Sequence, residues 1–206
     1  MIIKHLAVGP LQANCFIIGC KNTKKAAVVD PGGEGDKILT ALNDSQLNLE
    51  YILNTHGHFD HVGGNASLKN ATGAKILIHK EDEPMLSMVS ASASSWGMMA
   101  EDSPPPDKTI DEGDEITFGD VTLKVIHTQG HSRGGVSFYT EGFVFVGDTL
   151  FAGSIGRTDL PGGNYQDLID SVKTKLFTLD DNVQVLPGHM QDTTIGVERS
   201  TNPFFR

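Results

Sequence analysis

The chain has 206 residues, and 26 acidic side chains outnumber 16 basic ones, which gives a formal net charge of −10. A chain of this length is typical of one domain, so we expect residues 1–206 to form a single domain with a sizeable core. The acidic balance argues against nucleic acid as a partner, because binding to a phosphate backbone depends on clustered Lys and Arg.

Neither the N-terminus nor the cysteines indicate export or a membrane. Residues 1–5 lack the charged region and apolar stretch of a secretory signal, and no apolar run approaches the roughly 20 residues of a membrane span. Cys15 and Cys20 fit neither a redox pair nor a zinc ribbon. We therefore expect a cytoplasmic protein without a membrane partner, in which Cys15 behaves as a small core residue.

Short apolar runs recur along the chain, and most of them end in Gly, Pro or a polar cluster. Runs of this kind predict strands that are buried on both faces, while apolar residues at helical spacing predict helices packed against them. The predicted elements are, in chain order, a strand at 26–29, a helix at 36–42, a strand at 51–53, a helix at 64–70, strands at 75–78, 121–126 and 143–146, a helix at 164–172 and a strand at 183–186. Asn164 suits an N-cap. The pattern indicates sheets with helices on their outer faces.

The segment 85–106 has a different composition from the rest of the chain. It contains four of the six Met residues and the only Trp, and it ends in three consecutive prolines. We expect a surface insertion with a short helix packed on the core. A mobile lid, whose Met side chains adapt to a ligand, is the alternative that this composition leaves open.

The densest group of polar residues is the segment 55–61, which reads THGHFDH. A single His is more often structural than a metal ligand, but structural needs rarely produce three imidazoles and a carboxylate within six positions. In an extended segment His56 and His58 share a side, whereas Asp60 and His61 can turn toward a second point nearby. Donors of these types suit zinc, iron or manganese.

Three further donors each follow an apparent strand, namely His131, Asp148 and His189. Together with the first four they make seven, which is too many for one tetrahedral metal ion with three or four ligands. Seven donors suit two ions with a water held between them, as in two-metal hydrolytic sites. We therefore expect two divalent ions as the cofactor, with zinc ahead of iron or manganese.

These segments resemble the metallo-β-lactamase superfamily nearly from end to end. The HxHxDH pattern at 56–61 is typical of the whole superfamily, and the longer segments 147–159 and 187–199 are similar to short glyoxalase II-like hydrolases of the hydroxyacylglutathione hydrolase type. The resemblance implies an α/β fold, a four-layer αβ/βα sandwich with the metal site at its edge. Only 17 residues follow His189, so we expect no counterpart of the C-terminal helical domain of full-length glyoxalase II.

The resemblance also implies a role for each donor. The first metal ion would be held by His56, His58 and His131. The second would be held by Asp60, His61 and His189, and Asp148 would bridge the two ions. Asp60 and Asp148 are accordingly the expected catalytic residues.

Several neighbouring residues are expected to be structural. His127 is not a ligand in this family and should support its loop by a hydrogen bond, and His5 and His79 are also expected to be structural. Gln129 stands where relatives usually carry Pro, which relaxes the turn but removes no ligand. Arg157 is expected either to stabilise its loop through Asp159 or to order the site.

The function implied by the resemblance is hydrolysis of a small-molecule thioester such as S-lactoylglutathione by a hydroxide held between two metal ions. The leaving thiolate needs little proton help, because a thiol pKa is about 8.5. A lactonase would use the same seven ligands. A persulfide dioxygenase would use a single iron held by His56, His131 and Asp148. A β-lactamase is disfavoured, because those enzymes commonly carry Cys at the position of Asp148. The oligomeric state is left open.

Overall fold

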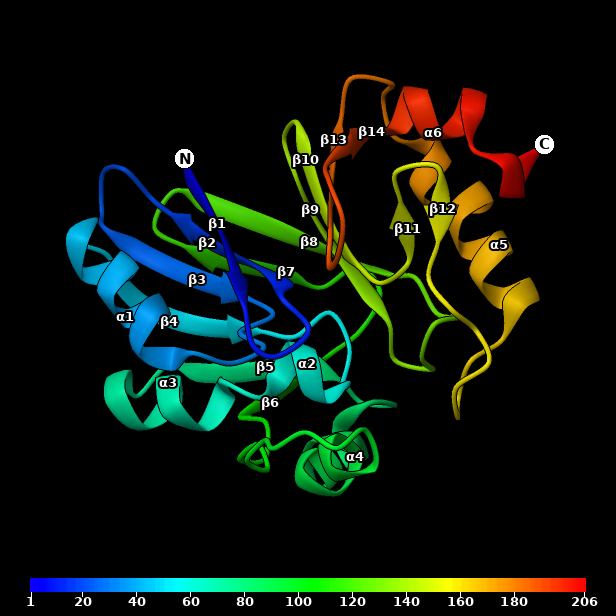
Figure 1. Ribbon diagram of the computed structural model, residues 1–206. Helices are drawn as coiled ribbons and strands as arrows, with labels where there is room; N and C mark the ends of the chain where they lie inside the picture. Colours follow the sequence, from blue (N-terminus) through cyan, green and yellow to red (C-terminus); the bar gives the residue numbers. More distant parts are fainter.

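The N-terminal half of the protein forms one six-stranded sheet. In the computed structural model, which describes residues 1–206, its strands are β1 (Ile2–Val8), β2 (Ala13–Gly19), β3 (Lys25–Val29), β4 (Asn48–Leu53), β5 (Lys75–His79) and β6 (Lys108–Ile110), paired in that order. The pairs from β1 to β3 are antiparallel and those from β3 to β6 are parallel. The helices α1 (Gly35–Asp44) and α3 (Asn65–Thr72) connect parallel strands, so both lie on the outer face of this sheet (Figure 1).

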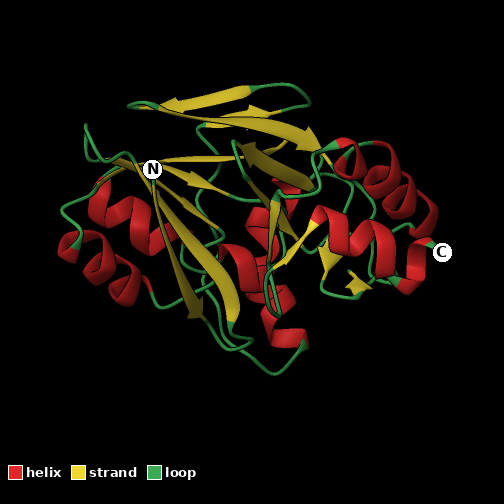
Figure 2. Cartoon of the chain, turned by 90° about the horizontal axis from the view of Figure 1, so that it is seen from above, coloured by secondary structure: helices red, strands yellow, loops and turns green.

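The C-terminal half forms a second six-stranded sheet, which packs on the first. Its order is β14 (Thr193–Thr194), β13 (Gln184–Pro187), β10 (Phe143–Gly147), β9 (Val136–Thr140), β8 (Val121–His127) and β7 (Glu115–Phe118), and only β10 and β13 pair in parallel. The helices α5 (Tyr165–Thr174) and α6 (Ile195–Thr201) lie beside it. A small hairpin joins β11 (Leu150–Phe151) to β12 (Ser154–Ile155). Figure 2 shows the helices flanking the strands on both sides.

Alternation along the strands explains why the sheets have two apolar faces. Phe16 and Ile18 of β2 join the cluster between the sheets, while Ile17 joins the cluster under α1 and α3. In β10, Phe145 points between the sheets, and Val144 and Val146 pack with α5. The three apolar clusters separate four layers, which confirms the expected αβ/βα sandwich.

The elements predicted from the sequence are all present, with ends that differ by a few residues. Asn164 caps α5 as expected, since its side chain accepts hydrogen bonds from the backbone N–H of Gln166 and Asp167. Both cysteines are buried and free. None of the helices has the length and apolar character needed to cross a membrane.

Segment 85–106 packs on the core through short helices, as expected. The 3₁₀ helix η1 (Glu83–Met88) leads into α4 (Val89–Ser95), and Leu86, Val89 and Ala93 from these two helices join the outer cluster of the first sheet. Met88 and Trp96 remain 60% and 48% exposed. The buried residues anchor the helices and leave the large apolar side chains facing outward. The lid stays a hypothesis.

The candidate site lies where the carboxyl ends of strands from both sheets meet. The loops after β3, β4 and β5 leave the first sheet at this edge, and those after β8, β10 and β13 leave the second. Hydrogen bonds connect the two sheets at this edge. Val136 N–H, at the start of β9, donates to the carbonyl of Thr55, and Asn14 N–H, in β2, donates to the carbonyl of Gly188. Open sheets collect functional side chains at such an edge.

Candidate metal centre

The segment 55–61 changes from extended to helical backbone in its middle. His58 is still extended, with φ −69° and ψ 146°, and it is the N-cap of the one-turn helix α2 (Phe59–Val62). His56 and His58 therefore share one direction, while the helical turn sends Asp60 and His61 toward another. This is the division that the spacing predicted.

Two groups of donors face each other across the loop edge. One contains His56, His58 and His131, and the other contains Asp60, His61 and His189; within each group, ligand atoms lie within 4.8 Å of one another. In the first group, Nδ1 of His58 is 2.9 Å from Nε2 of His131. In the second, Nε2 of His189 is 3.1 Å from Oδ2 of Asp60 and 3.3 Å from Nε2 of His61.

Asp148 lies between the two groups and contacts both. Its Oδ2 is 3.6 Å from Nε2 of His131, and its Oδ1 is 3.5 Å from Nε2 of His61. Oδ2 is also 3.8 Å from Nε2 of His189. The carboxylate therefore lies between the two groups, as a bridging carboxylate would. All seven residues expected from the sequence are brought together.

Two polar atoms at this centre fit bound cations. Nε2 of His56 and Oδ1 of Asp148 are buried and have no hydrogen-bond partner. Leaving such atoms unpaired costs roughly 1–3 kcal/mol each, and native structures rarely tolerate it. A cation in each donor group would give both atoms a binding partner. Neutral imidazoles and carboxylates are donors that divalent transition metals prefer. The seven residues could therefore hold two ions.

Hydrogen bonds behind the imidazoles determine which nitrogen faces the centre. Nδ1 of His56 is 3.0 Å from Thr55 Oγ1, and Nδ1 of His131 is 2.7 Å from the carbonyl oxygen of Arg157. Nδ1 of His61 is 3.1 Å from Oδ2 of Asp30. Each contact engages Nδ1 and leaves Nε2 for the centre, the usual arrangement behind metal-binding His residues. His58 instead turns its Nδ1 inward.

Asp30 is a supporting residue whose role the sequence analysis did not identify. Besides His61, its carboxylate accepts hydrogen bonds from Thr55 N–H at 2.7 Å and Thr55 Oγ1 at 2.6 Å. It is 1% exposed and adopts a positive φ of 50°. Its position directly after a strand and before Pro-Gly-Gly was the available signal.

Asp82 was also missed, and its sequence context conceals it. It stands between Glu81 and Glu83, a run typical of a solvated surface, yet it is 1% exposed. Its carboxylate accepts from Gly57 N–H at 3.1 Å, Ser132 Oγ at 2.6 Å and Gly134 N–H at 2.7 Å. It thereby ties the loop of His56 and His58 to the loop of His131.

The loop of His189 is held by the first hairpin. The side-chain amide of Asn14 donates to the carbonyls of Pro187 and Met190, each at 2.9 Å. Its Oδ1 is 2.7 Å from Nε2 of His5, which lies outside the centre as expected. Gly188 must be a glycine, because a Cβ there would lie 2.4 Å from Oδ1 of Asp148.

A separate group of possible donors lies outside the metal centre and supports the loop that contains Arg133. It consists of His79, Asp111 and His127. Nε2 of His127 is 2.9 Å from the carbonyl oxygen of Arg133, which confirms the predicted support. The ring of His79 stacks on that of His127 with centroids 4.2 Å apart, and its Nε2 is 3.4 Å from Asp111. Because Lys80 already pairs with Asp111, this carboxylate is neutralised.

Electrostatics prepare the two groups differently. Burial lowers the pKa of His56 and brings the pKa of His58 to about 4, with help from neighbouring imidazoles, so both are neutral at pH 7. Burial also disfavours charged His61, but the carboxylates of Asp60 and Asp148 outweigh it and raise the pKa of His61 to about 10. Without metal, His61 carries the positive charge of the site; a cation would replace that proton.

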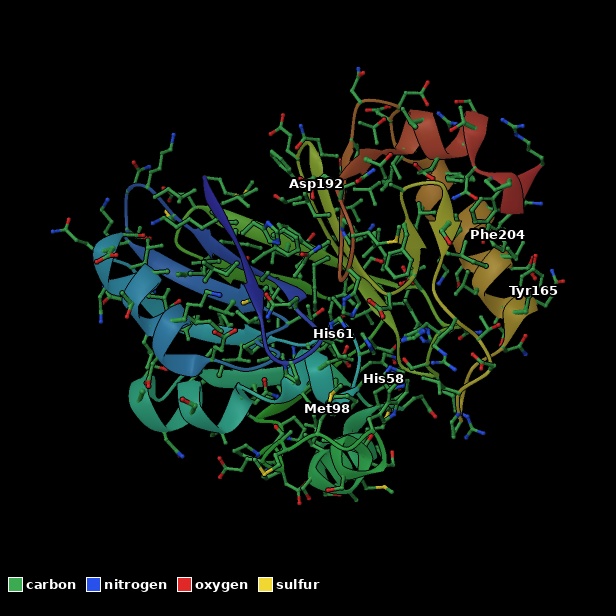
Figure 3. All side chains as sticks on the ribbon, viewed as in Figure 1. His58, His61, Met98, Tyr165, Asp192 and Phe204 are labelled. Atoms are coloured by element: carbon green, nitrogen blue, oxygen red, sulfur yellow. The ribbon has the colours of Figure 1, made fainter.

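Five of the seven donors form the floor of a cleft with a volume of about 580 Å³, namely His58, Asp60, His131, Asp148 and His189, while His56 and His61 are buried beneath it. Figure 3 labels His58 and His61 between the two sheet halves, with α4 below them. Arg157 lies at the cleft and makes the predicted ion pair, with Nε and Nη2 donating to the Asp159 carboxylate at 2.8 and 2.7 Å. Its backbone carbonyl is 2.7 Å from Nδ1 of His131. The ion pair is thus confirmed, whereas a role of the Arg157 side chain in ordering the site stays a prediction.

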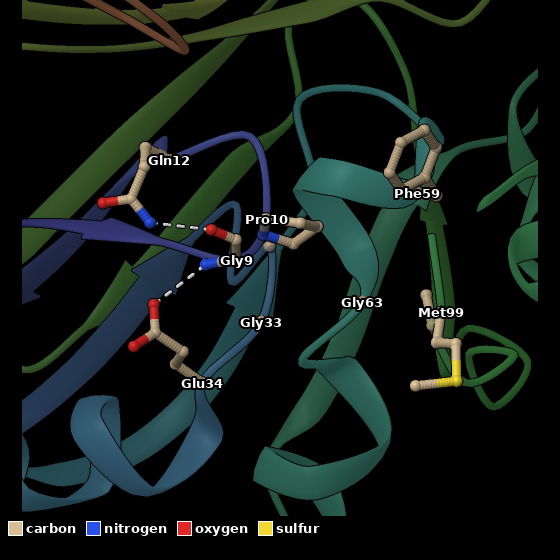
Figure 4. Close-up of a pocket in the computed structure, with 10 residues that line it drawn as sticks. Gly9, Pro10, Gln12, Gly33, Glu34, Phe59, Gly63 and Met99 are labelled. Atoms are coloured by element: carbon tan, nitrogen blue, oxygen red, sulfur yellow. Dashed lines mark hydrogen bonds between the residues drawn. The ribbon is translucent and has the colours of Figure 1, made fainter. Parts of the chain in front are cut away.

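A second hollow of about 420 Å³ lies on the other side of Phe59, which lines both cavities. Figure 4 shows its wall, where Gly9 N–H donates to Glu34 at 3.0 Å and the Gln12 amide donates to the Gly9 carbonyl at 2.8 Å. It contains no metal-binding group of the centre. Glu34 is its only charged residue.

The model of the metallo-beta-lactamase superfamily matches residues 8–189, a range that includes both donor groups and Asp148. The chain belongs to this superfamily. It is 36% identical to hydroxyacylglutathione hydrolase GloC of Haemophilus influenzae, over 99% of this chain and 98% of the relative.

Two solved members of the superfamily are similar over almost their whole length. The BLEG-1 B3 metallo-beta-lactamase has a TM-score of 0.92 and 35% identity, and the alignment covers 99% of each chain. TTHA1623 in a di-iron-bound form has a TM-score of 0.90 and 38% identity, with 98% of this chain and 99% of the other covered. These similarities support a metal-dependent hydrolase of this superfamily.

Proposed function

We propose that the protein is a glyoxalase II-like hydrolase that cleaves thioesters of the S-lactoylglutathione type with two metal ions. The observation that carries the proposal is the position of Asp148. Its carboxylate lies between two complete donor groups, and its buried Oδ1 has no hydrogen-bond partner. The similarity to hydroxyacylglutathione hydrolase GloC supports the choice of a thioester. Zinc is the proposed metal, and iron is the alternative that the di-iron-bound relative supports.

When bound, two divalent ions would supply Lewis acidity for the acyl carbonyl and lower the pKa of a water molecule toward neutrality. The residues of the chain supply geometry and charge. Three imidazoles donate Nδ1–H to Thr55 Oγ1, the Asp30 carboxylate and the Arg157 carbonyl, and these hydrogen bonds hold the rings so that Nε2 faces the centre. Such preorganisation avoids reorientation during the reaction.

Asp60 and Asp148 are the proposed catalytic carboxylates. Burial disfavours charge on Asp60, but His61 and His189 outweigh it and lower its pKa, so the group stays ionised and can hold a cation. The leaving thiolate does not require a strong general acid, because thiols have a pKa of about 8.5. The cleft accordingly needs no Ser, Cys or Lys nucleophile, and none of its lining residues is Cys or Lys.

Metal stoichiometry together with a thioester assay tests this proposal. We expect close to two ions per chain after reconstitution with zinc, and hydrolysis of S-lactoylglutathione that depends on them. His61→Ala should reduce the stoichiometry toward one and lower kcat/KM by at least about a hundredfold. One ion per chain in the native protein, with His61→Ala fully active, would refute the dinuclear hydrolase.

Three alternative activities can be measured on the same sample. The similarity to BLEG-1 makes β-lactam hydrolysis the second candidate. A single-iron persulfide dioxygenase would use His56, His131 and Asp148 as its donors. Its readout is oxygen uptake by iron-loaded protein supplied with glutathione persulfide. Oxygen uptake without thioester cleavage would favour the dioxygenase, and a lactone assay separates the lactonase.

A further inference from the structure

The cleft above the metal centre has an apolar wall that the donors do not explain. Met85 and Met88 of η1 and Trp96 after α4 form one side, and Leu160 with Pro161 contributes to the other. Met88 and Trp96 are among the few large apolar side chains left exposed on this protein. Exposed apolar groups that line one hollow typically mark a ligand surface.

Positive charge in the cleft is already neutralised. Arg157 is the only Lys or Arg among the lining residues, and its guanidinium makes two hydrogen bonds to Asp159. The same guanidinium lies over the ring of Trp96, 5.7 Å from its centroid. In the neighbouring hollow Glu34 is the only charged lining residue, and Lys37 beside it already contacts Glu34 and the Ala7 carbonyl. Apart from the proposed metal ions, a thiol with two carboxylates, such as glutathione, therefore finds no unpaired Lys or Arg among the lining residues.

The apolar wall lies on the side of His58 and His131. Met85 packs so closely on Gly57 that a Cβ on this glycine would lie 2.7 Å from Met85 Cβ. Gly57 separates His56 from His58, and the loop of Arg157 holds His131. We assign polarisation of the acyl carbonyl to the ion that this group would hold, so the acyl chain, rather than the thiol half, would lie beside the wall.

We propose that the cleft selects thioesters by an apolar acyl group of several carbons, and that it recognises the thiol half weakly. This inference rests on the proposed thioester hydrolysis and specifies its substrate class. Apolar contacts with Met85, Met88 and Trp96 are non-directional, and the flexible Met side chains accommodate different acyl shapes. The volume of about 580 Å³ is within the range of small-molecule sites.

The acyl preference is tested with thioesters of one neutral thiol, N-acetylcysteamine. We expect kcat/KM of the zinc-loaded protein to increase from acetyl to butyryl to hexanoyl, by about fourfold per added methylene at most. A total increase of at least about tenfold would support the proposal, because the wall is partly open to solvent. The lactoyl thioesters of glutathione and N-acetylcysteamine should differ by less than about tenfold.

Variants of the wall separate this effect from folding. Trp96→Ala and Met88→Ser should each reduce the hexanoyl-to-acetyl ratio by about threefold to tenfold. The matched control is Tyr165→Ala on α5, an aromatic residue that is 51% exposed, close to the 48% of Trp96, and lies away from the centre (Figure 3). It should leave the ratio unchanged.

Binding gives a readout without turnover, because Trp96 is the only tryptophan. Ketone analogues of the thioesters, in which a methylene replaces sulfur, should change its fluorescence saturably, with Kd decreasing as the acyl chain lengthens. Equal kcat/KM across the acyl series, or a preference for the glutathione thioester above a hundredfold, would overturn the selectivity while leaving the hydrolase intact. No cleavage of any thioester by protein with two ions per chain would overturn both.

Discussion

At the metal centre beneath the cleft, three of the five imidazoles are each held by a hydrogen bond from Nδ1 to Thr55, Asp30 or the Arg157 carbonyl. The side chains of the wall residues Met85, Met88 and Trp96 make no such hydrogen bonds; they pack against their neighbours, and the Arg157 guanidinium lies over the ring of Trp96. Hydrogen bonds lose their energy with small errors in angle, whereas apolar contacts tolerate shape changes. We infer that the floor determines the chemistry and that the wall can vary to determine the substrate.

Removal of metal should break this contrast most completely. A chelator is expected to abolish hydrolysis and lower Tm, because ions that bind only the folded state stabilise it by mass action. The fluorescence response of Trp96 to a ketone analogue should weaken less than hydrolysis does, because the wall contains no metal-binding residue. Readdition of zinc should restore activity. Full activity in protein shown to contain no metal would contradict the proposed floor.

Asp148→Ala should have the next largest effect. Because its oxygens face both donor groups, we expect lower occupancy of both sites and a loss of kcat/KM of at least about a thousandfold. Elemental analysis and the thioester assay measure the two effects in one preparation. Asp148→Asn keeps the size of the side chain and serves as the second variant. Normal metal content in both variants would show that the bridge lies elsewhere.

Asp82→Asn tests whether the floor depends on residues that never touch a metal. The amide cannot accept all three hydrogen bonds that the Asp82 carboxylate accepts from Gly57, Ser132 and Gly134. We expect metal affinity to fall by about tenfold to a hundredfold, as for other outer supports of metal sites. The control Asp102→Asn changes an exposed carboxylate that accepts from Ser90 N–H in the same region. Equal affinity in the two variants would contradict the role of Asp82.

Arg157→Ala should have the smallest effect on the floor. The backbone carbonyl that binds His131 remains, so metal content should not change. The lost contacts are the exposed ion pair with Asp159 and the approach to Trp96, and exposed pairs contribute little. We expect kcat/KM to fall by less than about tenfold, mainly through KM. A loss of metal would place the side chain itself among the supports of the site.

The local pattern of the sequence predicted six of the strands, the helices α1, α3 and α5, and the set of seven donors, but not β1, β2, β7 or β9. Their positions could be predicted because each signal is short-range: an apolar run ends in a donor, or extended backbone changes to helix within the segment 55–61. The division of His56 and His58 from Asp60 and His61 follows from that change alone. The αβ/βα arrangement came from the resemblance, and the three apolar clusters confirm it.

Only the tertiary structure decided how the donors are supported and what surrounds them. Asp82 and Ser132 are 50 residues apart, and Asn14 and Pro187 are 173 apart. A carboxylate within the acidic run 81–83 and an amide in a strand show no sign of such partners in the sequence. The composition of segment 85–106 left open that its Met side chains contact a ligand, but not which of them face a cleft, because Met and Trp at helical spacing normally indicate a core. When this helical segment packs on the core, it buries Leu86, Val89 and Ala93 and leaves Met88 and Trp96 exposed at the cleft.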